Sequence, residues 1–322
     1  MRDEFVKVLT ELAQEDPNLI LITGDLGFGV LTEFSKILPN QFINAGVAEQ
    51  NMTGLAVGLA LEGKTVFTYS IGNFPTLRCL EQIRNDACYH QANIKIVAVG
   101  GGFSYGSLGI SHHATEDLAI MRALPNMTIV APGDVVEAAE ATRKIYQTPG
   151  SCYLRLGRGG EPRIHQEKID FRIGKALNVL KGKKINVIST GGILKNCFGA
   201  VQKLQKKGLD IGLYSMHTLK PLDSETIVSL AKSSDLIITV EEHSVIGGLG
   251  SGIAEIVSQM PGDKAMLKII GLQDCFSSKV GDQDYLREAY GIATDNIINS
   301  IEQAVISLKQ RGALSEVAAG RG

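Results

Sequence analysis

Short apolar runs alternate with helical segments along most of this chain, and that alternation constrains the fold more than any other feature. The first apolar run is Leu19–Thr23, and similar strands are expected at Thr65–Thr68 and Ile94–Val99. Helices are expected around them, first at residues 3–14 and then at Glu49–Leu61. Buried strands connected by helices are typical of mostly parallel sheets that are covered on both faces. The pattern therefore predicts an α/β fold.

The chain is expected to contain two domains, each a mostly parallel sheet flanked by helices. Its 322 residues suit about two domains of ordinary size. The first is predicted over residues 1–165 and the second over residues 185–311, where the strand–helix pattern restarts. Residues 166–184 carry scattered charge and glycine and are interpreted as a linker. Residues 312–322 are interpreted as a disordered tail.

Composition and charge argue against several classes of protein. A net charge of -2 with 20% charged residues gives no basis for binding nucleic acid or a membrane surface. No uncharged apolar run reaches the roughly 18 residues of a membrane span, and the acidic N-terminus does not resemble a secretory signal. The 5 cysteines include no C-x-x-C pair, which favours free thiols in a reducing compartment. We therefore expect a cytoplasmic protein.

The stretch Ile43–Gly58, INAGVAEQNMTGLAVG, is the richest candidate for chemistry. It places one carboxylate, Glu49, among Ala, Gly, Val and Met, and apolar surroundings favour proton sharing by a carboxyl group. A Glu near the start of an Ala-rich helix is also common as a capping or surface residue. Spacing alone leaves both interpretations open.

Several motifs in order along the chain resemble the transketolase family. GVAEQNMTGLAVGLA resembles the family's pyrimidine-domain motif, and the blocks TYSIGNFPTLRCLEQIRNDACYH, GGGFSYGSLGISHHATEDLAIMRALPNMTIVAPGD and YLRLGRGGEP continue the similarity. LKPLD and VEEHSVIGGLGSGIAE resemble the family's C-terminal domain. The resemblance covers residues 1–310 and is more specific than any single motif. It implies a thiamine-diphosphate pyrimidine-binding domain followed by a transketolase C-terminal domain.

The resemblance also implies which residues contact the cofactor. Glu49 would hydrogen-bond N1′ of the aminopyrimidine and favour its 4′-imino tautomer, which activates the cofactor. Phe74 would stack on the aminopyrimidine, with Tyr69 as the alternative, although either ring is also consistent with a core aromatic. Asp25 matches an acidic residue near the cofactor, and a simple turn-capping Asp is equally consistent with its position.

Two further residues are assigned to the substrate by the same resemblance. His112 falls on the family's active-site histidine, which would stabilise developing oxyanions or move protons at the donor hydroxyl. Arg158 matches an arginine that contacts the acidic end of the substrate, with Arg155 as the nearby alternative or a structural residue. Metal binding by His112 and the adjacent His113 is disfavoured because no third ligand has suitable spacing.

The family's diphosphate-binding motif, G-D-G followed by an Asn, does not occur in this sequence. We therefore expect no metal ligands in this chain, and we expect Mg²⁺ and the diphosphate to be held by a partner, the N-terminal transketolase subunit. The expected assembly is α2β2, with active sites at the interfaces between subunits. The chain alone is expected to form a homodimer.

Three positions depart from the substrate-contacting residues of typical transketolases. Leu108 stands where an Asp reads a donor hydroxyl, and the Gly100–Gly102 run replaces a phosphate-contacting His. Gly29 replaces a Ser near the first turn. These departures suggest a modified or differently charged ketose donor.

The leading interpretation is one subunit of a transketolase that transfers a two-carbon ketol unit from a ketose donor to an aldose acceptor. One alternative is a β-type subunit of a thiamine-dependent 2-oxo acid decarboxylating enzyme, or of a deoxyxylulose-phosphate-synthase-like enzyme. Another is a non-catalytic regulatory subunit. The SHHATED and LGRGG motifs favour transketolase, and Glu49 and His112 in matching places argue against a purely regulatory role.

Overall fold

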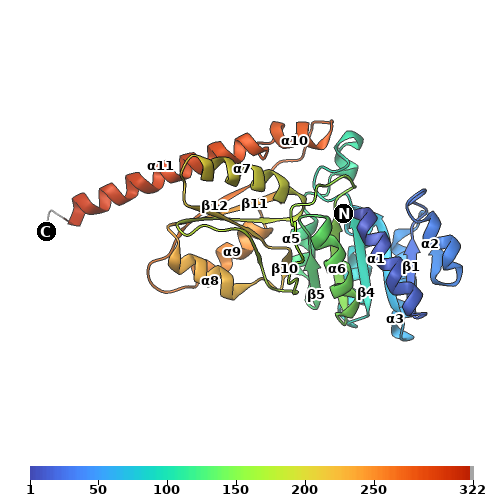
Figure 1. The fold of residues 1–322 in the computed structure, drawn as a ribbon. Helices are drawn as coiled ribbons and strands as arrows, with labels where there is room; N and C mark the ends of the chain where they lie inside the picture. Colours follow the sequence, from blue (N-terminus) through green and yellow to red (C-terminus); the bar gives the residue numbers. More distant parts are fainter. Residues whose placement is uncertain (320–322) are drawn as a thin grey trace.

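The computed structural model describes the backbone of residues 1–319 and the side chains of residues 1–310. Two lobes, each built on its own sheet, lie side by side, and one long helix projects away from them (Figure 1). Both sheets are mostly parallel and flanked by helices, which confirms the predicted α/β fold with two domains.

The first sheet has seven strands in the order β10-β5-β6-β4-β3-β1-β2. All neighbours pair in parallel except β10, which runs antiparallel to β5. The strands are β1 Leu19–Thr23, β2 Phe42–Asn44, β3 Thr65–Ile71, β4 Ile94–Val99, β5 Met127–Val130, β6 Ser151–Leu156 and β10 Thr218–Lys220. Because β10 comes from the second half of the sequence, the first sheet is completed by residues that follow the second domain's first helix.

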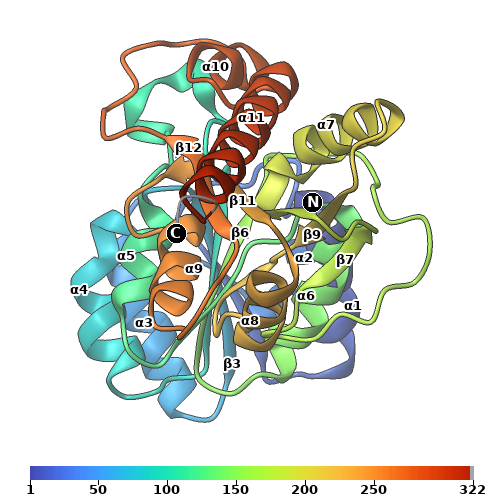
Figure 2. The same cartoon turned by 90° about the vertical axis from the view of Figure 1, so that its left-hand side faces the viewer.

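Helices cover both faces of the first sheet. They are α1 Arg2–Glu15, α2 Thr32–Ile37, α3 Glu49–Leu61, α4 Leu80–Gln82, α5 Asp117–Ala123 and α6 Val135–Gln147, with the short 3₁₀ helices η1 Pro39–Gln41, η2 Leu77–Cys79, η4 Gly106–Leu108 and η5 Ile110–His112 and the π-helix η3 Ile83–Cys88. Figure 2 shows α3, α4 and α5 on one side of this sheet and α1 and α6 on the other. In β1, Leu19 and Leu21 join the α1 and α6 core, whereas Ile20 and Ile22 join the α3 core. Successive side chains of a strand point to opposite faces of the sheet, so a strand that is buried on both faces needs apolar residues at every position.

The second sheet has five strands in the order β12-β11-β8-β9-β7, parallel except for the antiparallel β7–β9 pair. Its strands are β7 Leu177–Leu180, β8 Ile185–Thr190, β9 Ile211–Ser215, β11 Leu236–Ser244 and β12 Met266–Leu272. Its helical elements are η6 Gly191–Ile193, α7 Leu194–Lys206, α8 Ser224–Ser233, α9 Leu249–Ser258, α10 Gln283–Ala289 and α11 Thr294–Ala319. β7 lies within the segment 166–184 that was expected to be linker, so part of that segment is an edge strand of the second sheet.

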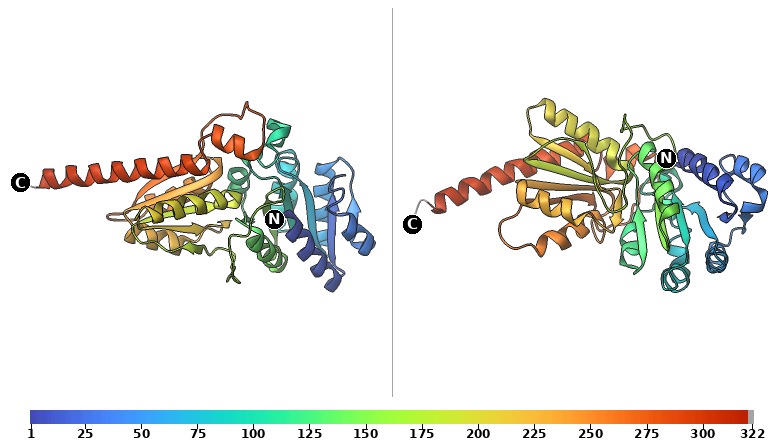
Figure 3. Two further views of the ribbon diagram at one scale, coloured as in Figure 1. Left: turned by 45° about the horizontal axis from the view of Figure 1, so that its top comes forward. Right: turned by 60° about the horizontal axis from the view of Figure 1, so that its bottom comes forward.

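The terminal helix α11 extends beyond the second domain in both views of Figure 3. It continues to Ala319, which differs from the disordered tail expected over residues 312–322. The Ala, Leu and Glu residues of this stretch favour helix over coil and continue the helix past Gly312. Residues 320–322 lie outside the described residues.

The carboxyl ends of strands from both sheets meet where the domains join. Arg155, near the end of β6, donates through Nε to Asp117 Oδ2 at 2.9 Å and through Nη2 to the backbone carbonyl of Glu242 at 3.2 Å. Glu242 Oε1 accepts from the backbone N–H of Phe103 at 2.7 Å, and its Oε2 accepts from Arg287 Nε at 2.9 Å. These buried bonds fix the loop after β4, from the first domain, against the second domain.

No helix within residues 1–319 is both long enough and apolar enough to cross a membrane. The 5 cysteines are free, and only Cys275 is exposed.

Candidate active site

Glu49 is the first residue of α3, and its side chain is only 2% exposed. Gly24, which directly follows β1, packs against it: a Cβ at position 24 would lie 3.3 Å from Glu49 Cγ. Arg78 Nη1 donates to Glu49 Oε2 at 2.6 Å. Among side chains of residues 1–310, no other group hydrogen-bonds to this carboxylate. Glu49 is therefore a buried carboxylate with one oxygen available to a ligand, which excludes the surface interpretation.

The Glu49–Arg78 pair lies against an aromatic ring. The guanidinium carbon of Arg78 lies 4.7 Å from the centroid of the Phe74 ring, and the Arg78 side chain is 46% exposed. The Phe74 ring meets the imidazole of His112 edge to face, with centroids 5.1 Å apart. The structure thus brings Glu49, Phe74 and His112 together from α3 and from the loops that follow β3 and β4. Sequence reasoning missed Arg78, whose only signal was its place four residues after Phe74 in the GNFPTLR motif.

A cavity of about 370 Å³ opens beside Phe74. It is lined by Asn73, Phe74, Leu77, Arg78, Ile110, Ser111, His113, Glu116 and Phe276. Two buried polar atoms at this wall, Asn73 Oδ1 and His113 Nδ1, have no hydrogen-bond partner among the described side chains and backbone. Buried polar atoms are normally satisfied, so these two suit a polar ligand. The Phe74 ring and the unsatisfied polar atoms fit a flat polar ligand such as the aminopyrimidine of thiamine diphosphate, and Glu49 lies behind this wall, bonded to the lining residue Arg78.

His112 is half-buried at the end of η5. Its Nδ1 lies 3.0 Å from Ser111 Oγ. Burial and the nearby His113 both lower the pKa of His112. The imidazole is therefore mainly neutral at pH 7 and is able to accept a proton.

Tyr69 and Asp25 occupy different surroundings. Tyr69 is 2% exposed in β3, stacks on Phe5 of α1 with centroids 6.1 Å apart, and has its pKa raised by burial. It is therefore a core aromatic and does not line the cavity beside Phe74. Asp25 is exposed in the turn after β1, where its Oδ1 accepts from Asn44 Nδ2 at 2.9 Å. This bond fits the turn-capping interpretation, and a cofactor contact by Asp25 stays a prediction.

The two arginines after β6 also differ. Arg155 is buried and held by Asp117, so the structural alternative applies to it. Arg158 is exposed, and its guanidinium carbon lies 5.3 Å from the centroid of Tyr105. Arg158 also lines a cavity of about 390 Å³ between the two domains. Arg155 lines the same cavity, but its guanidinium is paired with Asp117, whereas a substrate contact by Arg158 stays a prediction.

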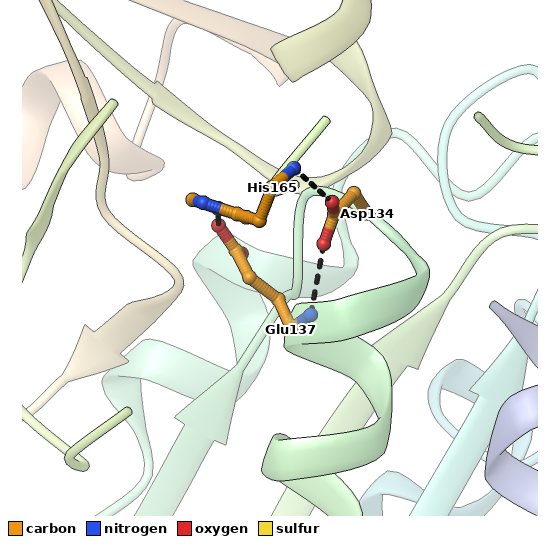
Figure 4. Close-up of side chains that lie close together, drawn as sticks. All are labelled: Asp134, Glu137 and His165. Carbon is orange, nitrogen blue, oxygen red and sulfur yellow. Dashed lines mark hydrogen bonds and ion pairs between the residues drawn. The ribbon is translucent and has the colours of Figure 1, made fainter. Parts of the chain in front are cut away.

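Away from this site, Asp134, Glu137 and His165 place their side-chain ligand atoms within 4.8 Å of one another (Figure 4). Hydrogen bonds account for that geometry. Asp134 caps α6 and accepts from four backbone N–H groups, two at the start of α6 and two at residues 164 and 165. Glu137 binds His165 Nε2 at 2.8 Å and accepts from Ser215 Oγ at 3.0 Å. The cluster ties α6 to the connecting segment and to β9 of the second sheet.

These contacts shift the pKa values of Glu137 and His165 in opposite directions. Burial alone would raise the pKa of Glu137, but the hydrogen bond and positive charge of His165, with His217 nearby, outweigh it and lower that pKa. Burial alone would lower the pKa of His165, but Glu137 and Asp134 outweigh it and raise that pKa. The cluster is thus a buried ion pair between the connecting segment and α6.

Comparison with known proteins identifies both halves of the chain. Residues 1–161 match the transketolase pyrimidine-binding domain, and residues 174–297 match the transketolase C-terminal domain. A putative transketolase C-terminal section from Methanocaldococcus jannaschii is 38% identical over 304 residues, which cover 94% of this chain and 95% of that protein. One of the subunits of an apulose-4-phosphate transketolase from Phocaeicola vulgatus is 37% identical over 275 residues, with 85% and 87% covered. A 6-deoxy-6-sulfo-D-fructose transketolase subunit from a Clostridium species is 34% identical over 304 residues, covering 94% of each chain.

Solved structures agree with this assignment. A structure described as an inactive β4 tetramer of a split-gene transketolase is 35% identical, with a TM-score of 0.86, and covers 95% of this chain and 98% of its own. A Pichia stipitis transketolase, 19% identical with a TM-score of 0.82, shares the fold over 46% of its length. The chain therefore belongs to the transketolase family, as a C-terminal subunit made of the pyrimidine-binding and C-terminal domains.

Proposed function

We propose that this chain supplies the pyrimidine half of a thiamine-diphosphate-dependent transketolase active site that an N-terminal subunit completes. The reaction is transfer of a two-carbon ketol unit from a ketose donor to an aldose acceptor. The observation that carries the proposal is the buried carboxylate of Glu49, which accepts a hydrogen bond from Arg78, whose guanidinium lies over the Phe74 ring. A cytoplasmic location suits the free cysteines but rests on the sequence alone.

Three side chains of this subunit have separate tasks in the proposed reaction. When bound, thiamine diphosphate supplies the carbanion chemistry, and the protein positions it and manages protons. Glu49 would hydrogen-bond N1′ of the aminopyrimidine through Oε1, the carboxylate oxygen that Arg78 does not use. Phe74 offers a flat face for stacking. His112, which is neutral at pH 7, accepts a proton from the donor hydroxyl.

The partner is an N-terminal transketolase subunit that carries the diphosphate and Mg²⁺ site. This proposal rests on the missing G-D-G motif and on the names of the relatives, which describe a C-terminal section and single subunits of transketolases. The proposed assembly is α2β2. Alone, the chain is proposed to self-associate as a homodimer, and the split-gene relative shows that a related chain forms a β4 tetramer.

The donor is proposed to be a ketose other than an ordinary sugar phosphate. Leu108, Gly100 and Gly29 replace residues that contact common donors, and Leu108 is exposed at its position. Two relatives are named for apulose 4-phosphate and 6-deoxy-6-sulfo-D-fructose. A donor screen with the reconstituted pair tests this point, and a preference for xylulose 5-phosphate contradicts it.

The central experiment substitutes Glu49 in the reconstituted pair. Glu49→Gln should lower kcat at least about a thousandfold, in the range lost with a general acid–base group, while thiamine diphosphate binding followed by circular dichroism changes far less. Glu62→Gln, at the exposed end of the same helix, is the matched control and should keep full activity. A Glu49→Gln pair with near-normal turnover contradicts the assignment.

One relative favours a second candidate reaction. A 1-deoxy-D-xylulose-5-phosphate synthase from Caldanaerobacter subterraneus is 31% identical over 304 residues, which cover 48% of that protein. A decarboxylating partner enzyme would release CO₂ from pyruvate. Measuring ¹⁴CO₂ from labelled pyruvate alongside ketol transfer distinguishes the two reactions, and a regulatory subunit would support neither.

A further inference from the structure

The second domain contributes one side chain to the cavity beside Phe74. That side chain is Phe276, in the segment 273–282 between β12 and α10. Every other residue that lines this cavity belongs to the first domain. Phe276 is 79% exposed, and burial of an exposed apolar ring is favourable, so a ligand that covers Phe276 is stabilised by the contact. The cavity therefore has a wall from each domain.

Close backbone contacts fix the segment 273–282 on the loop that carries His112. The backbone N–H of Gly281 donates to the carbonyl oxygen of Gly106 at 3.4 Å. The two backbones approach so closely that a Cβ at position 106 would lie only 2.6 Å from the carbonyl oxygen of Gly281. Glycine at position 106 permits this approach because it has no side chain. The segment that carries Phe276 is therefore packed against the first domain.

Tyr290 connects the two walls of the cavity. Its hydroxyl accepts a hydrogen bond at 3.1 Å from the backbone N–H of Ser278, which lies close to Phe276 in the same segment. Its ring stacks on Phe103, with centroids 5.4 Å apart and planes inclined by 29°. Phe103 in turn meets the imidazole of His113 edge to face, with centroids 5.2 Å apart, and His113 lines the cavity. Tyr290 thus links the segment of Phe276 to the first-domain wall.

The lining of the cavity suits a flat ring with polar edges. Apolar surface comes from Phe74, Leu77, Ile110 and Phe276, and the two unsatisfied polar atoms of the same wall offer hydrogen bonds. Small-molecule sites combine apolar surface with few polar groups in this way. A protein partner would also bury Phe276, but a cavity of about 370 Å³ is large enough to take a small ligand. The lining therefore favours a ligand as the group that covers Phe276.

We propose that Phe276 is a cofactor-contacting residue, whose ring covers one side of the aminopyrimidine when thiamine diphosphate is bound. The place of the cofactor in this cavity rests on the proposed function. Phe276 supplies apolar contact, and Tyr290 is a positioning residue that holds the segment of Phe276 against the first domain. The second domain thereby takes part in cofactor binding.

The first experiment measures thiamine diphosphate binding by the reconstituted pair in the absence of any donor. Phe276→Ala should raise the Kd for thiamine diphosphate about tenfold, the loss that partial burial of one phenylalanine ring predicts. Phe276→Leu keeps apolar surface and should recover part of the affinity. Ile306→Ala, at an exposed apolar residue of α11 outside the cavity, is the matched control and should bind as the unsubstituted chain does. An unchanged Kd for Phe276→Ala overturns the proposal.

The second experiment measures the affinity between the two subunits without cofactor, by surface plasmon resonance. Phe276→Ala should leave this affinity unchanged, because the ring contacts the cofactor. If the affinity between the subunits falls as much as the affinity for thiamine diphosphate does, Phe276 is a partner contact and the proposal is wrong.

The third experiment tests the positioning role of Tyr290. Tyr290→Phe keeps the ring on Phe103 but removes the acceptor for the Ser278 N–H. It should weaken thiamine diphosphate binding in the unsubstituted chain and have no further effect in Phe276→Ala, whereas additive losses contradict a role through Phe276. Cofactor binding that depends on Phe276, in a pair that transfers no ketol unit, refutes only the proposed function.

Discussion

The Glu49–Arg78 pair allows a quantitative test of the candidate site in the isolated chain. Arg78→Met keeps an apolar stem of similar length but removes the donor to Glu49 Oε2. The Glu49 side chain is 2% exposed and the Arg78 side chain is 46% exposed. Fully buried pairs lose about 3–5 kcal/mol when one partner is removed, and exposed pairs are worth less than about 1 kcal/mol.

With one partner buried and the other half-exposed, the expected cost of Arg78→Met lies between these limits, at about 2 kcal/mol. That loss corresponds to a fall of about 4–8 °C in Tm for a domain of this size. Glu49→Gln removes the buried charge that Arg78 compensates. In the double variant, the second substitution should therefore cost little beyond the first.

The assay is a double-mutant cycle on the free energy of unfolding in urea, with the single variants, the double variant and the unsubstituted chain. We expect a coupling energy of about 2 kcal/mol between Glu49 and Arg78. Arg84→Met, at an exposed arginine in η3, replaces Arg78→Met in a control cycle and should be additive with Glu49→Gln. A Glu49–Arg78 coupling below about 0.5 kcal/mol would refute the reasoning, because it would mean that the buried carboxylate does not depend on Arg78.

Three further predictions concern stability. Gly100→Ala should cost about 1–3 kcal/mol, because its Cβ overlaps the Tyr105 ring and φ is +93°; combining it with Tyr105→Ala should remove the steric part, and strict additivity in urea unfolding would contradict the overlap. Arg155→Met should lower the free energy of unfolding by about 3–5 kcal/mol, because it leaves the buried Asp117 carboxylate without its charged partner. Calorimetry measures the loss, and an unchanged Tm would show that Arg155 does not stabilise the contact between the two domains. His165 has a raised pKa, so its pairing with Glu137 stabilises fully below the unfolded value of 6.5 and fades as pH rises through the folded pKa. Glu137 has a lowered pKa, so its contribution holds above 4.5 and fades as pH falls through its folded pKa. His165→Gln should therefore flatten the decline of unfolding free energy above pH 6.5, and an unchanged pH profile would contradict the pairing.

Long, strongly patterned elements were predictable from the sequence. The strands Leu19–Thr23 and Ile94–Val99 and the helix Glu49–Leu61 have the bounds expected from their apolar runs and helix-forming residues. Short elements without such a pattern were not predicted. β10 has three residues and pairs with β5, which lies far away in the sequence, so only the fold reveals it as a strand. The edge strand β7 was missed within the expected linker for the same reason.

The candidate site was predictable only in part. Motif order placed Glu49, Phe74 and His112 on different loops and helices, and the parallel sheet brings them to one edge because the carboxyl ends of parallel strands point the same way. Tyr69 could not be separated from Phe74 by composition, because both are aromatic residues near the end of β3. Their places relative to β3 separate them: the Tyr69 side chain lies on the strand face that packs against α1, whereas Phe74 lies in the loop after the strand.

Sequence by itself determined the α/β class, the two-domain division, the family resemblance and the absence of the G-D-G motif, because these depend on local patterns and on order along the chain. Tertiary structure alone decided that Arg78 bonds to Glu49 and lies over Phe74, and that Arg155 is buried and paired with Asp117 while Arg158 is exposed. It also decided that Tyr105 takes the space beside Gly100. These facts depend on distances between residues that the chain separates, and burial and pairing energies are set by those distances rather than by residue type.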